Sequence, residues 1–170
     1  WLQTRRGLLD GVCVSGGEPT LAADLPDLLQ RIRALGFAVK LDTNGTRPDA
    51  LRRLLAEGLV DMVAMDLKAP LDERYADVAG RDVDVAALRE SVEALRAWGG
   101  SYEFRTTVGP QVSVTWLRDI AAELHRDEAW YLQAFRPAEG VDAALAAQAA
   151  PGEDDLLAMA EGLRALAPGV

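Results

Sequence analysis

The sequence predicts an α/β fold built on a parallel sheet, and three observations support this. Five short segments favour strands, and each is followed by a segment with helical periodicity. The predicted strands are apolar on both faces, as in Met62-Val63-Ala64-Met65, which is typical of a covered sheet. Polar residues collect at the C-terminal end of each predicted strand. Strands that alternate with helices favour right-handed parallel crossovers. We predict a partial (β/α) barrel over a flat doubly wound sheet, although periodicity alone does not separate the two.

Local signals place the individual elements. Val12 and Val14 favour a strand that stops at a glycine pair, and leucines at helical spacing precede Gly36, Gly58 and Gly99. A looser segment containing Tyr75 follows the third strand. The predicted strands are residues 12–14, 37–41, 60–65, 102–108 and 129–135, and the predicted helices are residues 24–35, 48–57, 85–98, 116–125 and 154–166.

Composition limits the class of protein. The 170 residues carry 18 basic and 27 acidic side chains, and a net charge of −9 argues against a nucleic-acid surface. No apolar run approaches membrane-spanning length, so we expect no membrane association. A lone cysteine excludes an internal disulfide and fits a reducing cytoplasm. We predict a single domain over residues 1–170, with a flexible connection at 138–152 and a closing helix at 153–167.

Polar clusters lie at the C-terminal ends of all five predicted strands, at the edge where barrel-type α/β proteins build their sites. Helix capping and loop solvation explain one or two such clusters, but not the whole set. The clusters are Gly16-Gly17-Glu18, Asp42-Thr43-Asn44, Asp66 with Lys68, Arg105 with Thr107, and Gln133 with Arg136.

The charges in these clusters predict the kind of ligand. Glu18, Asp42 and Asp66 can receive an ammonium group or a metal cation, whereas Lys68 and Arg105 can receive a carboxylate. A zwitterionic amino acid needs both. A phosphate would ask for more amides and bases, so a phosphate-binding barrel enzyme is the least favoured interpretation.

The ordered set of motifs resembles the radical SAM superfamily, in particular its glycyl-radical activase branch and the anaerobic ribonucleoside-triphosphate reductase activating proteins. The similarity covers residues from about 1 to 137. It is carried by Ser15-Gly16-Gly17-Glu18-Pro19-Thr20, Leu41-Asp42-Thr43-Asn44-Gly45-Thr46, Met65-Asp66-Leu67-Lys68-Ala69-Pro70, Tyr102-Glu103-Phe104-Arg105-Thr106-Thr107-Val108 and Tyr131-Leu132-Gln133-Ala134-Phe135-Arg136-Pro137.

The resemblance implies an activity and its partners. Such an activase cleaves S-adenosylmethionine reductively at a [4Fe-4S] cluster, and the resulting 5′-deoxyadenosyl radical forms a glycyl radical on a ribonucleotide reductase. It implies a glycyl-radical ribonucleotide reductase as partner, an electron donor such as flavodoxin or ferredoxin, and an anaerobic cytoplasm. Other radical SAM enzymes, such as a queuosine-pathway synthase, and a cluster-less S-adenosylmethionine-binding or interaction module remain alternatives.

The resemblance also implies roles for individual residues. Gly16, Gly17 and Glu18 would bind the methionine ammonium group of S-adenosylmethionine. Asp42, Thr43 and Asp66 match positions that line a monovalent-cation site beside the methionine carboxylate in related activases. Lys68 would neutralise that carboxylate or bind the substrate backbone, and Arg105 would contact the cofactor from the next strand. The resemblance also implies that Asn44 is one of the cofactor-binding residues.

The cysteine content does not match that family's cluster loop. The loop has the pattern Cys-x3-Cys-x2-Cys, whereas this sequence has only Cys13, which we expect to be a small buried hydrophobic residue. The chain begins with Trp1, and residues 1–6 read like the end of a helix. We therefore expect a fragment that lacks the first strand and the cluster loop, contains no catalytic residue or metal ligand, and is inactive by itself.

Overall fold

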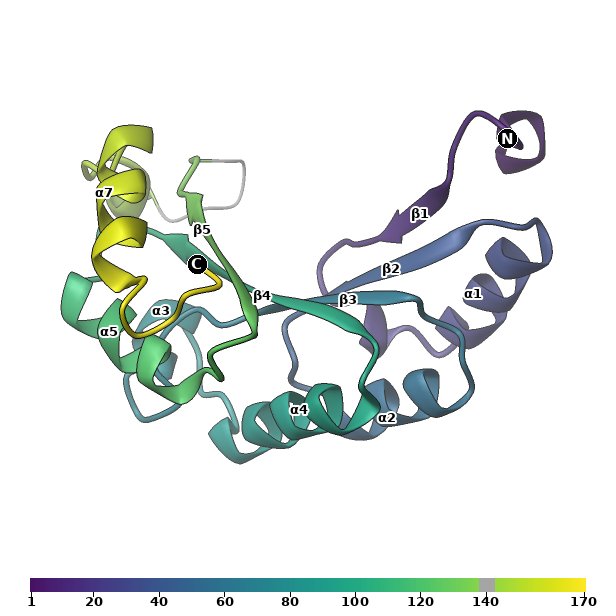
Figure 1. Ribbon diagram of the computed structural model, residues 1–170, viewed down its shortest axis with the longest axis horizontal. Helices are drawn as coiled ribbons and strands as arrows, with labels where there is room; N and C mark the ends of the chain where they lie inside the picture. Colours follow the sequence, from purple (N-terminus) through teal and green to yellow (C-terminus); the bar gives the residue numbers. More distant parts are fainter. Residues whose placement is uncertain (138–142) are drawn as a thin grey trace. The chain divides into compact units, whose positions relative to one another are not determined.

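The computed structural model describes residues 1–137 and 143–170, and its five strands form one sheet in the order β1-β2-β3-β4-β5. The pairs β1–β2, β2–β3 and β4–β5 are parallel, so the predicted α/β class with a parallel sheet is confirmed (Figure 1). The strands are β1 (Gly11–Val14), β2 (Ala38–Thr43), β3 (Met62–Asp66), β4 (Ser101–Val108) and β5 (Ala129–Ala134).

Helices follow the strands, as the alternating pattern predicts. Two short 3₁₀ helices, η1 (Leu2–Arg5) and η2 (Pro19–Leu21), lie near the start of the chain. The α-helices are α1 (Leu25–Ala34), α2 (Pro48–Ala56), α3 (Tyr75–Ala79), α4 (Val85–Trp98), α5 (Val114–Glu123), α6 (Ala143–Ala146) and α7 (Glu153–Leu163).

The chain divides into two compact units. Unit 1 comprises residues 1–66 and 84–102, and unit 2 comprises residues 67–83 and 103–170. The assignment of all 170 residues to a single domain stays a prediction. None of the helices in the two described stretches of the chain is long and apolar enough to cross a membrane.

In unit 1, helices α1, α2 and α4 cover one face of the strands β1, β2 and β3 (Figure 1). Burial along β2 alternates, because successive side chains of a strand point to opposite faces: Val39, Leu41 and Thr43 are buried, and the intervening Lys40 and Asp42 are half-buried. The core of this unit therefore lies between the strands and the helices, and Lys40 and Asp42 lie on the opposite face.

Cys13 is exposed, so the expectation that it is a buried hydrophobic residue is wrong. Along β1 the half-buried residues are Val12 and Val14, and Cys13 lies opposite Lys40 in the parallel register. The two-residue period of the strand turns the valines toward one face and the cysteine toward the other. Hydrophobic composition alone did not reveal which face each residue takes.

Unit 2 is organised around a buried hydrogen-bonded chain between β4, β5 and the segment after β3. The indole Nε1 of Trp130 donates to Thr106 Oγ1 at 2.9 Å, and Thr106 Oγ1 donates to the Leu67 carbonyl at 2.5 Å. Thr106 and Trp130 are fully buried. The Leu67 amide in turn donates to the Arg105 carbonyl at 2.8 Å, which ties residues 67–68 to β4.

The element bounds differ from the prediction at a few places. β2 extends to Thr43, two residues past the predicted end, and the loose segment contains the short helix α3. Helix α5 ends at Glu123, so the exposed His125 follows the helix, and its amide donates to Glu128 Oε2 at 2.6 Å. The expected connection at 138–152 contains α6, and residues 138–142 lie outside the described residues.

Candidate ligand-binding site at the strand ends

The carboxyl ends of β1, β2 and β3 meet at one edge of unit 1. Val14 lies opposite Leu41, and Thr43 lies opposite Met65, so the residues that follow each strand emerge side by side. In parallel α/β sheets this edge is where binding sites form. The predicted groups of Gly16 to Glu18, Asp42 to Asn44, and Asp66 all belong to this edge.

Glu18 accepts four hydrogen bonds, and two of them join the segment after β1 to the end of β2. Its Oε1 atom accepts from Thr20 N at 3.1 Å, from Thr20 Oγ1 at 2.5 Å and from Thr43 Oγ1 at 2.8 Å. Its Oε2 atom accepts from the Asn44 amide at 2.6 Å. The structure therefore brings together Glu18, Thr43 and Asn44 from the predicted set. Thr20 was not predicted, and the only local signal for it is a hydroxyl two residues after a loop carboxylate.

The loop after β2 is held by further hydrogen bonds. Thr43 Oγ1 accepts from the Gly45 amide at 3.1 Å, and Asn44 Oδ1 accepts from Thr46 N at 3.0 Å and Thr46 Oγ1 at 2.7 Å. The buried Ser91 of α4 donates from Oγ to the Gly45 carbonyl at 2.6 Å. The backbone beside Glu18 is thus fixed by the body of unit 1.

Gly16 and Gly17 offer accessible backbone next to the carboxylate. Gly16 has φ +150°, a conformation that favours glycine, and both residues are exposed. A Cβ atom added at either position would meet nothing within 4 Å. Their peptide groups can therefore be approached closely, as a ligand that uses backbone carbonyls requires.

Asp42 and Asp66 add negative charge at the same edge. Both are half-buried. Asp42 alternates with Thr43 along β2, so its side chain lies on the face of the strands opposite the helices, whereas Thr43 is buried and bonded to Glu18. Three carboxylates from three successive strand ends give unit 1 an edge suited to a cationic group.

Lys68 and Arg105 both lie in unit 2. The Leu67–Arg105 backbone bond of 2.8 Å places them on neighbouring segments there, and the Lys68 amide donates to the hydroxyl of the buried Tyr75 at 3.3 Å. Both side chains are half-buried. These contacts bring the two predicted cationic residues together within their own unit.

The residues present do not fit an iron–sulfur cluster. Such a cluster is held by several cysteine thiolates, and the sequence has one cysteine. Among residues 1–137 and 143–170, no group of three or more His, Cys, Asp or Glu side chains is arranged to hold a metal ion. The strand-end edge can therefore bind and orient a ligand, and no redox step is assigned to these residues.

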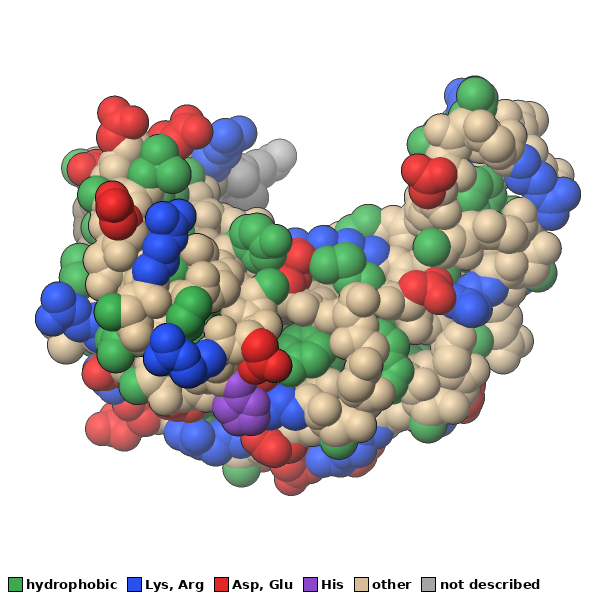
Figure 2. Space-filling model, in the orientation of Figure 1, with side chains coloured by type: hydrophobic (Ala, Val, Ile, Leu, Met, Phe, Trp, Pro, Cys, Tyr) green, Lys and Arg blue, Asp and Glu red, His purple; other side chains and the backbone are tan. Residues whose placement is uncertain are grey.

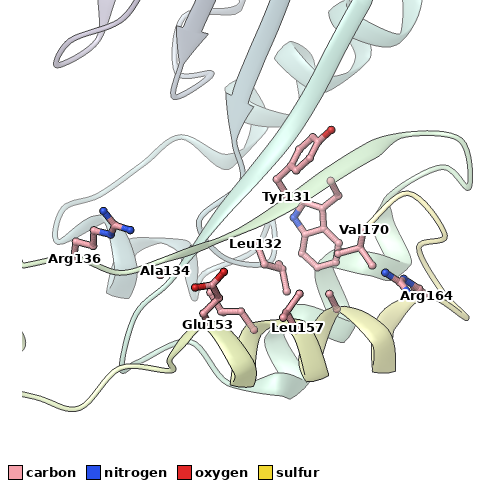
Figure 3. Close-up of a pocket in the computed structure, with 11 residues that line it drawn as sticks. Tyr131, Leu132, Ala134, Arg136, Glu153, Leu157, Arg164 and Val170 are labelled. Atoms are coloured by element: carbon pink, nitrogen blue, oxygen red, sulfur yellow. The ribbon is translucent and has the colours of Figure 1, made fainter.

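A second concave feature, a groove of about 590 Å³, lies between β5 and α7 in unit 2 (Figure 3). Tyr131 and Leu132 of β5 and Leu157 of α7 line it, with Arg136 and Arg164 at its border. Arg136 was predicted only as part of a strand-end cluster. The groove was not predicted, because its two walls come from separate parts of the sequence.

Charged side chains of both signs are interspersed on the face drawn in Figure 2.

Comparison with known proteins identifies the family. The sequence profile of the radical SAM superfamily matches residues 1–124. The chain belongs to the radical SAM superfamily. One relative is MJ1227 of Methanocaldococcus jannaschii, whose predicted activity is activation of a glycyl-radical enzyme. It is 30% identical over 153 residues, which are 86% of this chain and 63% of the relative. The chain thus spans less than two thirds of that protein.

Two further comparisons are informative. The 7-carboxy-7-deazaguanine synthase of Methanopyrus kandleri is 41% identical over 61 residues, which are 35% of this chain and 23% of that protein. A crystallised domain of pyruvate-formate lyase-activating enzyme from Bacteroides vulgatus has a TM-score of 0.65 at 18% identity, covering 92% of this chain and 94% of that domain. The structural similarity confirms the predicted partial-barrel fold of radical SAM proteins.

Proposed function

We propose that the strand-end edge of unit 1 binds the methionine end of S-adenosylmethionine. The observation that carries this proposal is the convergence of Gly16-Gly17-Glu18 with Asn44, fixed by the 2.6 Å bond from the Asn44 amide to Glu18 Oε2. Membership of the radical SAM superfamily supports S-adenosylmethionine as the ligand over other zwitterions.

Each residue of the site has a proposed part in binding. The Gly16 and Gly17 carbonyls and the Glu18 carboxylate receive the methionine ammonium group, and Asn44 holds Glu18. Asp42 and Asp66 line the place of a monovalent cation beside the methionine carboxylate, and Thr43 contributes through its backbone, because its hydroxyl is bonded to Glu18. The roles of Lys68 and Arg105, which lie in unit 2, stay predictions from the motif resemblance. The ammonium group and the Glu18 carboxylate have opposite charge. Because hydrogen bonds already hold the Glu18 side chain, it loses little conformational freedom when the ligand binds.

For the whole protein, we propose the activity of a radical SAM activase of an anaerobic ribonucleoside-triphosphate reductase. The similarity to MJ1227 supports activation of a glycyl-radical enzyme, and the motif resemblance favours the reductase as its target. A [4Fe-4S] cluster bound by the whole protein would supply the electron that cleaves S-adenosylmethionine, with flavodoxin or ferredoxin as donor. The residues described above contribute binding and orientation of the cofactor.

Competition binding tests the proposed site. Radiolabelled S-adenosylmethionine is equilibrated with the 170-residue chain by dialysis, and either L-methionine or 5′-methylthioadenosine is added. Since the proposed site grips the amino-acid end, L-methionine should displace the label, and 5′-methylthioadenosine should be the weaker competitor. Displacement by 5′-methylthioadenosine alone would exclude this site as the main anchor.

The proposed activity needs a separate test on the whole protein. After anaerobic cluster reconstitution, S-adenosylmethionine and a reductant should yield 5′-deoxyadenosine, and adding the reductase should yield a glycyl radical detectable by electron paramagnetic resonance. Absence of 5′-deoxyadenosine would contradict the enzymatic proposal. Its formation without a glycyl radical on the reductase would contradict only the proposed partner.

Two alternatives have specific support. The similarity to 7-carboxy-7-deazaguanine synthase favours a different radical SAM reaction. In the same assay, that reaction would yield 5′-deoxyadenosine without a glycyl radical on the reductase. The single cysteine favours a cluster-less S-adenosylmethionine-binding module. That alternative predicts unchanged binding in iron-free protein and no cleavage after reconstitution of the whole protein.

A further inference from the structure

We infer that Thr20 and Thr43 are positioning residues, which hold the Glu18 carboxylate in one orientation so that its Oε2 atom keeps one acceptor place for a cationic ligand group. The identity of that ligand rests on the proposed function. The orientation of Glu18 rests on the hydrogen bonds of unit 1 and can be tested without a ligand.

The distribution of donors around the carboxylate is unequal. Oε1 accepts three hydrogen bonds, two from Thr20 and one from Thr43, whereas Oε2 accepts one, from the Asn44 amide. An ionised carboxylate offers about four lone-pair sites, two on each oxygen. The lone-pair sites of Oε1 are therefore all occupied by hydrogen bonds from Thr20 and Thr43. Among the described residues Oε2 has a single donor, and Glu18 is half-buried, so a further donor can reach this oxygen.

The two threonines are suited to fixing a carboxylate. Their exposed fractions are 7% for Thr20 and 4% for Thr43, and a β-branched side chain has few rotamers. The Thr43 hydroxyl also accepts the Gly45 amide at 3.1 Å, so its proton is left to point at Glu18 Oε1, 2.8 Å away. Each hydroxyl thereby has a defined direction before any ligand binds.

A fixed carboxylate should bind a cationic group more tightly than a mobile one. A free glutamate side chain loses rotamer freedom when it forms a directed contact, and holding it beforehand removes that loss. Thr20 and Thr43 act through Glu18 in this account and contact no ligand through their hydroxyls.

The test compares Thr43→Val with Thr43→Ser and with Thr46→Val. Valine keeps the shape of threonine but removes both the donor to Glu18 and the acceptor of the Gly45 amide, and serine restores both. Thr46→Val is the matched control, because Thr46 lies in the same loop but its hydroxyl donates to Asn44 Oδ1 at 2.7 Å and not to Glu18. Two properties are measured well below the unfolding temperature of every variant: amide hydrogen exchange of Asn44 and the Kd of S-adenosylmethionine.

We expect Thr43→Val to accelerate exchange of the Asn44 amide and to raise the Kd about tenfold, since the change removes about one hydrogen bond to a charged group. Thr43→Ser should restore both values, and Thr46→Val should leave the Kd within about twofold. The double variant Glu18→Gln with Thr43→Val should bind no more weakly than Glu18→Gln alone, because both changes act on the same hydrogen bond between Thr43 and Glu18.

Two results would overturn the inference. One is unchanged Asn44 exchange in Thr43→Val, which would mean that Thr43 does not hold Glu18. The other is faster exchange with an unchanged Kd, which would make Thr43 a purely structural residue. If the parent chain binds no S-adenosylmethionine, the proposed function fails, and the exchange of the Asn44 amide alone then decides whether Thr43 positions Glu18.

Discussion

Gly45 sets the geometry of the loop that carries Asn44. Its φ of +74° favours glycine, and a Cβ atom added there would collide with Cε of the buried Met65. Its carbonyl also accepts the Ser91 hydroxyl. The close approach of this backbone to β3 explains why a glycine follows Asp42-Thr43-Asn44.

Gly45→Ala should therefore destabilise the protein by about 3 kcal/mol in urea unfolding, from unfavourable φ together with overpacking. Gly58→Ala is the matched control. Gly58 has a similar φ of +64°, but an added Cβ would meet nothing within 4 Å, so its cost should be about 1 kcal/mol. Equal costs at the two positions would show that Met65 does not constrain the loop.

Asp66 ends β3 and belongs to the proposed site. Asp66→Ala should weaken S-adenosylmethionine binding much more than it lowers the melting temperature, because a half-buried carboxylate at a strand end contributes little to the core. Dialysis and thermal unfolding measure the two effects. Comparable losses in both would assign Asp66 a structural role.

At the scale of elements, Thr106 links β4 to β5 and to the segment that carries Lys68. Thr106→Val would leave the buried Trp130 indole and the Leu67 carbonyl without their partner, and should cost about 3 kcal/mol in unfolding free energy. Thr107→Val, at an exposed position of the same strand, should change stability by at most about 0.5 kcal/mol. A small effect at both positions would contradict the role of this buried chain of bonds in unit 2.

Asp61 connects α1 to β2 and makes part of the stability depend on pH. Partial burial opposes ionisation of Asp61, but hydrogen bonds from Arg33 at 2.6 Å and from the Val39 amide at 2.7 Å outweigh it, so the pKa of Asp61 is lowered below its ordinary value of 3.8. The stability from this group is therefore present above pH 3.8 and is lost as the pH falls through the lower folded-state pKa.

Asp61→Asn should accordingly be less stable than the parent chain at neutral pH, and the difference should shrink as the pH falls below about 4. Urea unfolding at a series of pH values measures it. A difference that stays constant down to pH 2 would show that the ionised carboxylate contributes nothing to the link between α1 and β2.

At the scale of the whole molecule, the elements with local signals at both ends were predicted best. Helix α4 has the predicted bounds, because Asp84 caps the Ala86 and Ala87 amides and Gly99 ends the helix with φ +68°. The end of β2 was placed two residues early, because Asp42 and Thr43 are polar but still pair with β3. Tyr75 and its short helix carry no comparable pattern.

The candidate site was predictable as a set of strand ends, but its internal bonding was not. Gly16-Gly17-Glu18 and Asp42-Thr43-Asn44 stand out by their position after apolar segments. The bond from Thr43 to Glu18 joins residues 25 positions apart, and it depends on the register that sets Val14 opposite Leu41. The exposed face of Cys13 depends on the same register, which composition does not encode.

We propose that the strand ends of unit 1, and not the groove between β5 and α7, receive the amino-acid end of S-adenosylmethionine. The most direct measurement is a ¹⁵N chemical-shift titration of the 170-residue chain with S-adenosylmethionine. We expect the largest shifts at the amides of Gly16, Gly17 and Asn44. Shifts confined to Tyr131, Leu132 and Leu157, with those three amides unchanged, would contradict the claim.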